Sequence, residues 1–460
     1  MIDAPAISSL GERFEGELIV PGSAGYDGAR IVWNGMIDRR PALVARCDGV
    51  DDVVSAIRFG REHELPIAVR GGGHSVGGFS TCDDGIVIDL SRMHGVEIDA
   101  ERRVASVRGG SLLRELDTAA QEHGLVCPVG VVGHTGVAGL SLGGGMGRLQ
   151  RRLGFTVDNI LGVDLVTADG EQLHVSDDDH PDLFWGIRGA GSNFGIVTAF
   201  EFRVHEQSPE ITNGFLGFRA DRGAQVAGVV RGFLAERTDE VMVSLGYGRQ
   251  DPEGDPGYGG GPSVVVGLTY SGDPTGAEDA LRALVEPLRA LGPVEDTIAQ
   301  RRYLEVQTMN DEEMAWGKRF YMKGGFLAEL SDAAMDAAIE TVEDAPSPGA
   351  TITLWAHGGA ISRVPDDAMA FTGRDAAFWL GVESEWDDPG ADVDHVTWTR
   401  ATTAALEPFT AAGHYVNDMS DLEEGLARRI YGPAKYDRLV ELKRRYDPDN
   451  VFRLNQNISP

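Results

Sequence analysis

Cysteine and long apolar runs are both scarce in this sequence. Its 460 residues include only Cys47, Cys82 and Cys127, too few and too far apart for a disulfide framework or for the paired cysteines of a zinc site. No metal site is expected. Nowhere do about 18 apolar residues follow one another, and the first residues hold neither a basic segment nor a continuous apolar one. We therefore expect a cytoplasmic protein that makes no contact with a membrane.

Lysine is the second rare residue type. Only four of the 41 basic residues are lysines, and the formal net charge is −31. This charge would repel the phosphate backbone of a nucleic acid, so nucleic-acid partners are excluded. An acidic excess with so little lysine suits a protein that stays soluble in high salt, although a GC-rich genome also favours arginine. Halophily is therefore a hypothesis, and it predicts unfolding on dilution into low salt.

The first third of the chain predicts a strand, an amphipathic helix and a second strand at residues 41–47, 51–65 and 66–71. The stretch GGGHSVGG follows, and residues 85–91 then predict another strand. A dinucleotide-binding turn of the Rossmann type would instead open a helix after its first strand. A nicotinamide-dependent dehydrogenase is therefore disfavoured.

Two helices have polar residues at their expected starts. Asp51 or Asp52 is predicted to cap the helix at 51–65, and Ser111 is predicted to cap a helix at 111–124. After about residue 205 the pattern changes, and helices alternate with strands of alternating polarity. The helices are expected at 276–292 and 395–413, and the strands at 241–248, 263–270, 351–358 and 377–386. This pattern favours an α+β protein whose second domain is an antiparallel sheet backed by helices.

Three successive glycines precede His74. Gly71, Gly72 and Gly73 allow positive φ and a close approach of the backbone to a ligand, so their NH groups can converge on an anion. The alternative is a flexible turn. His74 is then either a structural histidine or a nucleophile that anchors a ligand covalently. A second glycine-rich loop around His134 could wrap the same extended ligand, or it could simply connect buried strands.

Several stretches together resemble one family. RGGGHS, GHTGVAGLSLGGGMG, RLGFTVDNI, HPDLFWGIRGAGSNFGIVTAFEF and YDPDNVFRLNQNI are similar to those of the berberine-bridge-enzyme-like, FAD-linked oxidases of the vanillyl-alcohol oxidase superfamily. The resemblance implies a two-lobed FAD-binding domain at 1–205 and a substrate domain at 206–424. It also implies that a C-terminal segment, 425–460, returns to the FAD-binding domain.

The resemblance also implies roles for residues at the cofactor. His74 would carry the flavin 8α-methyl group, and His134 would lie near the flavin N1 and C2 carbonyl, where negative charge accumulates on reduction. The pyrophosphate would be held by Arg70, Gly71, Gly72, Gly73 and Ser75. The remaining cofactor contacts would come from Thr135, Gly136, Gly139, Ile196, Val197 and Asn455.

Some relatives attach the flavin a second time, through a cysteine eight residues before the histidine of the second loop. Eight residues before His134 is Val126, and Cys127 is one residue out of register. Single attachment through His74 is favoured, and a second link through Cys127 stays open. The alternative for Cys127 is a small buried thiol.

The base that removes the substrate proton has several candidates. Many relatives carry a Tyr-x-Asn-Tyr stretch whose last tyrosine can act as base, and here Tyr415 and Asn417 match while Asp418 replaces that tyrosine. Asp418 is either the base or a solvated loop charge.

Other candidates lie on predicted strands of the substrate domain. Tyr321 and Lys323 alternate with Arg319 and would share one strand face, and His357 would share a face with Trp355. We expect such a face to cover the flavin. A salt bridge explains Lys323 about as well.

We expect an FAD oxidase that removes a hydride from a carbon bearing a hydroxyl or an amine and reduces O2 to H2O2. Its substrate would be a small alcohol, sugar, amine or secondary metabolite. The alternatives are a flavin dehydrogenase with another electron acceptor, and a flavin- or sugar-binding protein without turnover. Peroxide release in air distinguishes the oxidase from the dehydrogenase.

Overall fold

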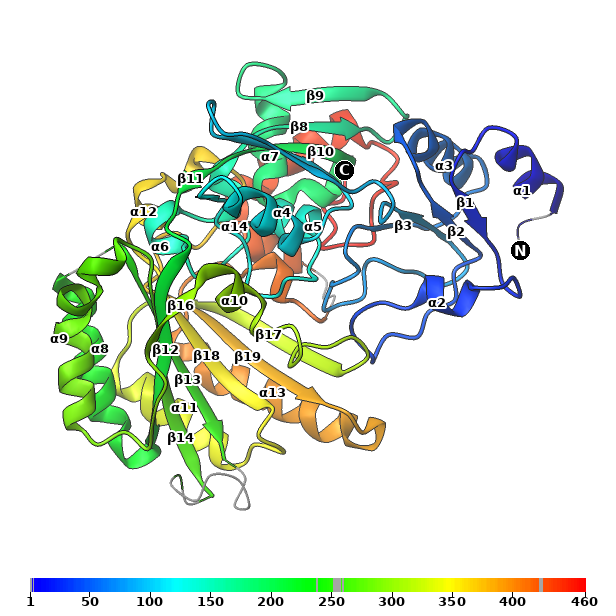
Figure 1. Ribbon diagram of the computed structural model, residues 1–460. Helices are drawn as coiled ribbons and strands as arrows, with labels where there is room; N and C mark the ends of the chain where they lie inside the picture. Colours follow the sequence, from blue (N-terminus) through cyan, green and yellow to red (C-terminus); the bar gives the residue numbers. More distant parts are fainter. Residues whose placement is uncertain (1, 3, 237–238, 251–257, 259, 422–424) are drawn as a thin grey trace.

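The computed structural model describes residues 2, 4–236, 239–250, 258, 260–421 and 425–460 (Figure 1). Three larger β-sheets organise these residues, two in a first half of the molecule and one in a second half. Each half has its own large hydrophobic core. The domain boundary expected at residue 424 lies among residues 422–424, outside the described residues.

The N-terminal sheet contains the predicted strand–helix–strand unit. Its order is β1-β2-β4-β3, in which β2, β4 and β3 run parallel and β1 is antiparallel. The strands β2 and β4 are apolar without alternation because both of their faces are covered. The elements are α1 (Ala4–Gly11), β1 (Glu17–Ile19), α2 (Tyr26–Arg30), β2 (Leu43–Arg46), α3 (Val50–Glu62), β3 (Ile67–Arg70) and β4 (Ile86–Asp89).

The second sheet is antiparallel, in the order β5-β6-β10-β8-β9, and packs with the helices α4, α5 and α7 around the core of the first half. A short pair, β7 and β11, lies beside it. The elements are β5 (Val96–Asp99), β6 (Val104–Arg108), α4 (Leu113–Gln121), β7 (Leu125–Val126), α5 (Val137–Gly143), α6 (Gln150–Leu153), β8 (Ile160–Val166), β9 (Gln172–Ser176), α7 (Pro181–Ala190), β10 (Ile196–Arg203) and β11 (His205–Glu206).

Two predicted helix caps were wrong. No side chain caps α3, which begins after Gly49, because Asp52 accepts hydrogen bonds from three backbone NH groups outside the helix. At α4 the NH of Leu112 donates to Glu115, while the hydroxyl of Ser111 bonds to the backbone of the preceding loop. Both polar side chains join segments distant in sequence, so tertiary contacts replaced the local cap.

The second half is an antiparallel sheet backed by helices, which confirms the predicted α+β fold (Figure 1). The strand order is β15-β12-β14-β13-β18-β19-β17, and β16 also pairs with β12. The strands are β12 (Glu210–Arg219), β13 (Val241–Arg249), β14 (Pro262–Tyr270), β15 (Glu295–Asp296), β16 (Ala299–Arg302), β17 (Arg319–Leu327), β18 (Ala350–Ala356) and β19 (Phe378–Trp386). The helices are α8 (Gly223–Glu236), α9 (Ala277–Ala290), α10 (Tyr303–Thr308), α11 (Asp332–Glu343), α12 (Ala360–Arg363) and α13 (Asp392–Leu406).

The two faces of this sheet have different neighbours. Side chains alternate along β19, so Leu380 and Val382 pack into the core beneath the helices, whereas Trp379 belongs to the core of the first half. Glu383 lies on the same face as Trp379. The face without helices is therefore turned toward the first half.

The end of the chain returns to the first half. The last helix, α14 (Leu426–Tyr446), packs against α7, and the segment after it is held by the fully buried Lys443. The Lys443 ammonium donates to the Asp447 carboxylate and to the carbonyls of Asn193 and Phe452. This buried cation fixes the path of the last residues toward the cavity described below.

No helix within the described residues has both the length and the apolar character needed to cross a membrane. The same residues hold no cluster of three or more His, Cys, Asp or Glu side chains arranged to bind a metal ion.

Candidate functional site

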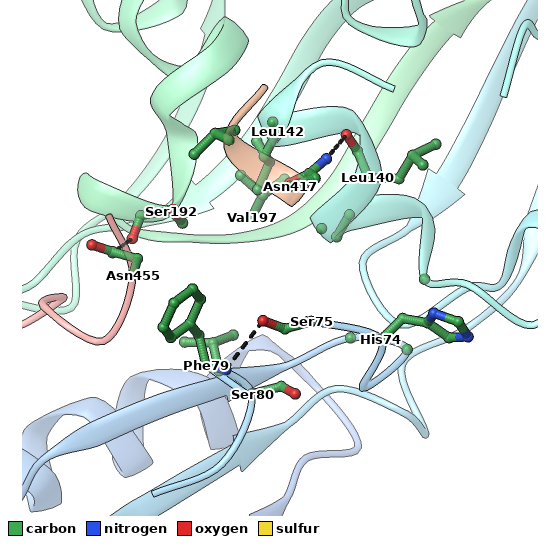
Figure 2. Close-up of a pocket in the computed structure, with 18 of the residues that line it drawn as sticks. His74, Ser75, Phe79, Ser80, Leu140, Leu142, Ser192, Val197, Asn417 and Asn455 are labelled. Carbon is green, nitrogen blue, oxygen red and sulfur yellow. Dashed lines mark hydrogen bonds between the residues drawn. The ribbon is translucent and has the colours of Figure 1, made fainter. Parts of the chain in front are cut away.

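A cavity of about 250 Å³ lies between the N-terminal sheet and the helix α5. The next cavity, of about 10 Å³, lies between the third sheet and its helices, so the first is the candidate for a cofactor. Figure 2 shows Ser75 and Phe79 on one wall and Leu142, Val197 and Asn455 on the opposite wall.

Two glycines bring the walls of this cavity into backbone contact. A Cβ atom on Gly72 would lie 2.2 Å from the backbone nitrogen of Gly136, and a Cβ atom on Gly136 would lie 2.3 Å from the nitrogen of Gly72. Gly73 adopts φ +70°, which larger residues rarely adopt. The glycines are therefore required by the close approach of the two loops.

Polar atoms at the cavity fit an extended ligand with many hydrogen-bonding groups. The Ser80 hydroxyl and the Asn455 side-chain oxygen are buried and lack a hydrogen-bond partner among the described residues. Both residues line the cavity. Buried polar atoms rarely stay unpaired, so a ligand that satisfies them fits this site. FAD, with its ribityl and pyrophosphate oxygens, has this chemistry.

Most residues that the resemblance assigned to the cofactor line this cavity. They are Gly71, Gly72, Gly73, His74, Ser75, Thr135, Gly136, Gly139, Ile196, Val197 and Asn455. The structure thus brings together four segments that lie far apart in the sequence.

Arg70, Cys127 and His134 are exceptions, and of these His134 precedes the lining residue Thr135 without lining the cavity itself. Side chains alternate along β3, so Val69 faces the cavity while Arg70 points away and donates to the carbonyl of Ala29. The expected contact of Arg70 with the pyrophosphate is therefore not formed by its side chain. Cys127 is fully buried in the core of the first half, and burial, reinforced by Asp117, raises the pKa of its thiol well above the usual value. The structure places this thiol away from the cavity lining.

His74 and His134 are direct neighbours. The Nε2 atom of His74 lies 2.8 Å from the Nδ1 atom of His134, and the His74 ring stacks on Trp33 with centroids 4.4 Å apart. Burial and the nearby His134 lower the pKa of His74 to about 3, so its ring is neutral at pH 7.

The segment after His414 links the cavity to the third sheet. The hydroxyl of Tyr415 accepts hydrogen bonds from the NH of Gly145 and the amide of Asn417. Asn417 also donates to the carbonyl of Leu140 and lines the cavity (Figure 2). Burial raises the pKa of Tyr415, and its oxygen is already engaged, so Tyr415 positions the loop rather than taking a proton.

Asp418 lies on the helix-free face of the sheet. Its carboxylate accepts a hydrogen bond of 2.5 Å from the Trp379 indole and lies over Gly324, where a Cβ atom would be 3.3 Å away. A Cβ atom on Gly381 would lie 2.5 Å from the Trp379 ring. These paired glycines of β17 and β19 leave room for both side chains. Burial, together with the charge of Glu383, raises the pKa of Asp418 well above its usual value. Asp418 is therefore not a solvated loop charge.

Glu383 is a buried acidic neighbour of Asp418 that the sequence analysis did not identify. Its carboxylate accepts a hydrogen bond of 3.0 Å from the Thr353 hydroxyl, and burial raises its pKa to about 7. A glutamate within the apolar strand pattern at 377–386 was the available signal. It was overlooked because only the tertiary structure shows which face of this strand meets the first half.

Tyr321 and Lys323 share a strand face, as predicted, but it is the wrong face for the flavin. They lie opposite Ser384 and Val382, on the side covered by α13. Both bond to Asp421, the phenol by a short contact and the ammonium at 3.3 Å. Their role is to anchor the segment that carries Asp418.

His357 is not at the candidate site either. It follows the last residue of β18 and is 3% exposed, with its ring 5.4 Å from that of Phe155 and 5.7 Å from that of Phe326. Burial lowers its pKa to about 3. It is a neutral packing residue of the core and not a partner of Trp355.

The family comparisons agree with this geometry. Residues 41–176 match the model of the FAD binding domain, and residues 414–459 match the model of the berberine and berberine-like family. The first match contains both glycine-rich loops, and the second contains Asp418 and Asn455.

Relatives cover almost the whole chain. (R)-6-hydroxynicotine oxidase of Paenarthrobacter nicotinovorans is 34% identical over 97% of each chain. The crystal structure of 6-hydroxy-D-nicotine oxidase from Arthrobacter nicotinovorans covers 100% of each chain, with 31% identity and a TM-score of 0.86. A xylooligosaccharide oxidase from Myceliophthora thermophila has the same fold, with a TM-score of 0.85 at 24% identity over 99% of each chain. This protein therefore belongs to the berberine-bridge-enzyme-like family of FAD-linked oxidoreductases.

Proposed function

We propose that this protein is an oxidase with FAD bonded to His74, and that it removes a hydride from a carbon bonded to an amine nitrogen. The observation that carries the proposal is the pair of carboxyl groups of Asp418 and Glu383 on the helix-free face of the sheet. Among the described residues, neither carboxyl forms an ion pair with a Lys, Arg or His side chain. A buried acidic pair without a cation favours a ligand that brings one.

The residues around this pair suit a protonated amine better than a neutral alcohol. Trp355 and Trp379 stand edge to face, with ring centroids 5.8 Å apart, and aromatic faces attract cations. (R)-6-hydroxynicotine oxidase is named for an amine substrate, which agrees with this preference. A small cyclic amine is the substrate class that we propose.

When bound, FAD supplies the hydride acceptor and transfers the electrons to O2, which yields H2O2. The protein residues orient the substrate and hold its proton. In this proposal Asp418 accepts the proton that the substrate nitrogen loses, since an ammonium group has no lone pair to assist hydride loss. Glu383 stabilises the bound cation, and burial together with the charge of Glu383 raises the pKa of Asp418, which makes its carboxylate a stronger base.

Two features support single attachment of the flavin through His74. His74 lines the cavity, whereas Cys127 is buried in the core beside Asp117. We expect the acid-precipitated protein to be yellow. The His74→Ala variant should release all of its flavin, and flavin that stays with that variant would instead point to Cys127.

The test of the substrate class is peroxide release in air from matched pairs of compounds. Each pair contains a cyclic amine and the cyclic secondary alcohol of the same ring size. We expect peroxide from amines only, and at least a tenfold lower kcat/KM for amines in Glu383→Gln than in the wild type. Turnover of the alcohols alone would refute the amine proposal, and flavin reduction without peroxide would indicate a dehydrogenase.

A further inference from the structure

His74, which lines the cavity, and its neighbour His134 are held by a loop from the second half of the chain. His134 Nε2 lies 3.3 Å from the carbonyl oxygen of Asp311, and the Asp311 carboxylate accepts a 2.6 Å hydrogen bond from the NH of Gly133. The Trp33 ring that stacks on His74 donates to the carbonyl of Met314. The segment between α10 and β17 therefore fixes both imidazole rings.

The hydrogen-bond network determines where the protons lie on these rings. A backbone carbonyl can only accept, so His134 Nε2 carries the proton that faces Asp311. The Nδ1 atom of neutral His134 is then an acceptor, and His74 Nε2 must donate to it. Neutral His74 has only this one proton. Its Nδ1 atom therefore keeps a free lone pair and is the nucleophilic atom of the ring.

We propose that His134 accepts the Nε2 proton of His74 when His74 Nδ1 bonds to the 8α carbon of FAD. A neutral imidazole that forms a new bond at Nδ1 becomes positively charged unless it loses its other proton. His134 is the only group that the structure places within hydrogen-bond distance of that proton among the described residues. It acts as a general base for the attachment, a role distinct from its expected contact with the flavin N1 region.

The step balances with O2 as the oxidant, which is also the oxidant of the proposed activity. One C–N bond forms, the 8α methyl group loses one proton, and His74 loses one proton to His134. Two electrons remain on the flavin. O2 then accepts these two electrons and both protons to give H2O2, and the flavin returns to its oxidised state.

The inference rests on the proposed covalent link, and its test measures the formation of that link rather than turnover. Full-length protein is produced without flavin in a riboflavin-starved host and incubated with FAD in air. The flavin that stays with acid-precipitated protein is followed over time for the wild type, His134→Ala, His74→Ala and His123→Ala. His123 is exposed and remote, so its variant is the matched control.

We expect His134→Ala to bind FAD noncovalently, so that acid precipitation releases it. The variant should form the covalent link at least about 10²-fold more slowly than the wild type, and added imidazole should restore part of the rate. His123→Ala should match the wild type, and His74→Ala should form no link. Attachment in His134→Ala at the wild-type rate would refute the inference while leaving the covalent oxidase intact. A wild-type protein that never holds covalent flavin would instead refute the proposed function.

A second measurement does not depend on any variant. NMR of the flavin peptide from digested wild-type protein identifies the histidine atom bonded to the 8α carbon. We expect Nδ1, and a link through Nε2 would contradict the tautomer assignment and the role of His134.

Discussion

Replacing Glu383 with Gln should make the folded protein more stable and, at the same time, slow the reduction of its flavin by an amine substrate. Burial raises the pKa of Glu383 from 4.5 to about 7, so the folded state holds this proton more tightly than the unfolded chain does. Below pH 4.5 the carboxyl is protonated in both states. Between pH 4.5 and about 7 only the unfolded chain ionises, and the folded state loses stability as the pH rises. Above about pH 7 the carboxyl is ionised in both states, and the folded protein bears the full free-energy cost of an ionised, buried Glu383.

The size of this cost follows from the same pKa values. Each pKa unit corresponds to about 1.36 kcal/mol, so the rise from 4.5 to about 7 costs at most about 3 kcal/mol, since partial exposure of Glu383 to water screens the effect. Unfolding entropy is about 2.1 cal/mol/K per residue, or about 1 kcal/mol/K for this chain. Glutamine keeps the hydrogen bond with Thr353 and never ionises. We therefore expect Glu383→Gln to raise Tm by up to about 3 °C at pH 8.5 and to leave it unchanged at pH 4.

The assay is thermal unfolding of the holoprotein at both pH values, together with anaerobic flavin reduction by an amine substrate. Glu340→Gln, an exposed glutamate on α11, is the matched control and should leave Tm unchanged at both pH values. A Tm difference between Glu383→Gln and wild type that does not depend on pH would refute the free-energy cost that we assign to ionised Glu383. A stabilised variant that reduces its flavin at the wild-type rate would remove Glu383 from the substrate site.

Three further predictions concern the base, the cofactor cavity and the end of the chain. Asp418→Asn should keep the hydrogen bond from Trp379 and slow anaerobic flavin reduction by about 10²-fold or more. In the wild type the reduction rate should rise with pH as Asp418 loses its proton, and this rise should be absent in Asp418→Asn. Gly72→Ala should lower the FAD content of purified protein, because its Cβ atom would lie 2.2 Å from the nitrogen of Gly136. Lys443→Met should lower the free energy of unfolding by about 3–5 kcal/mol, measured by urea titration, since a buried carboxylate loses its cation.

Each of these has a control or a contrary outcome. Wild-type flavin reduction in Asp418→Asn would move the base to Glu383. Gly228→Ala, whose Cβ atom would meet nothing within 4 Å, should keep full FAD content, and a normal FAD content in Gly72→Ala would contradict the required backbone approach. Unchanged stability of Lys443→Met would mean that the segment after α14 is held by its other contacts.

The cofactor side of the site was largely predictable from the sequence because it depends on backbone. Glycines around His74 and His134 allow close approach wherever the loops meet, and the structure places both loops at one cavity. Arg70 was misplaced, since its strand neighbour Val69 takes the side facing the cavity. The sequence position of Cys127 could not decide whether this residue forms a second covalent bond to the flavin. In the structure its thiol lies in the core and is not part of the cavity lining.

The substrate side was less predictable. The alternation of Arg319, Tyr321 and Lys323 was correct as a statement about one strand, yet α13 covers that face. Asp418 was identified by its place in a Tyr-x-Asn stretch, whereas Glu383 was missed. The two carboxyl groups lie on separate segments that the fold brings together, where Trp379 donates to Asp418 above the glycines of β17 and β19.

The sequence by itself determined the strand and helix order, the α+β architecture and the glycine loops that expose backbone at His74, because periodicity and backbone freedom are local properties. Only the tertiary structure decided which face of the third sheet meets the first half of the molecule. It also decided which carboxyl groups lose water there, and which nitrogen of His74 stays free. These outcomes depend on contacts between segments that are not neighbours in the sequence, and a local pattern contains no record of such partners.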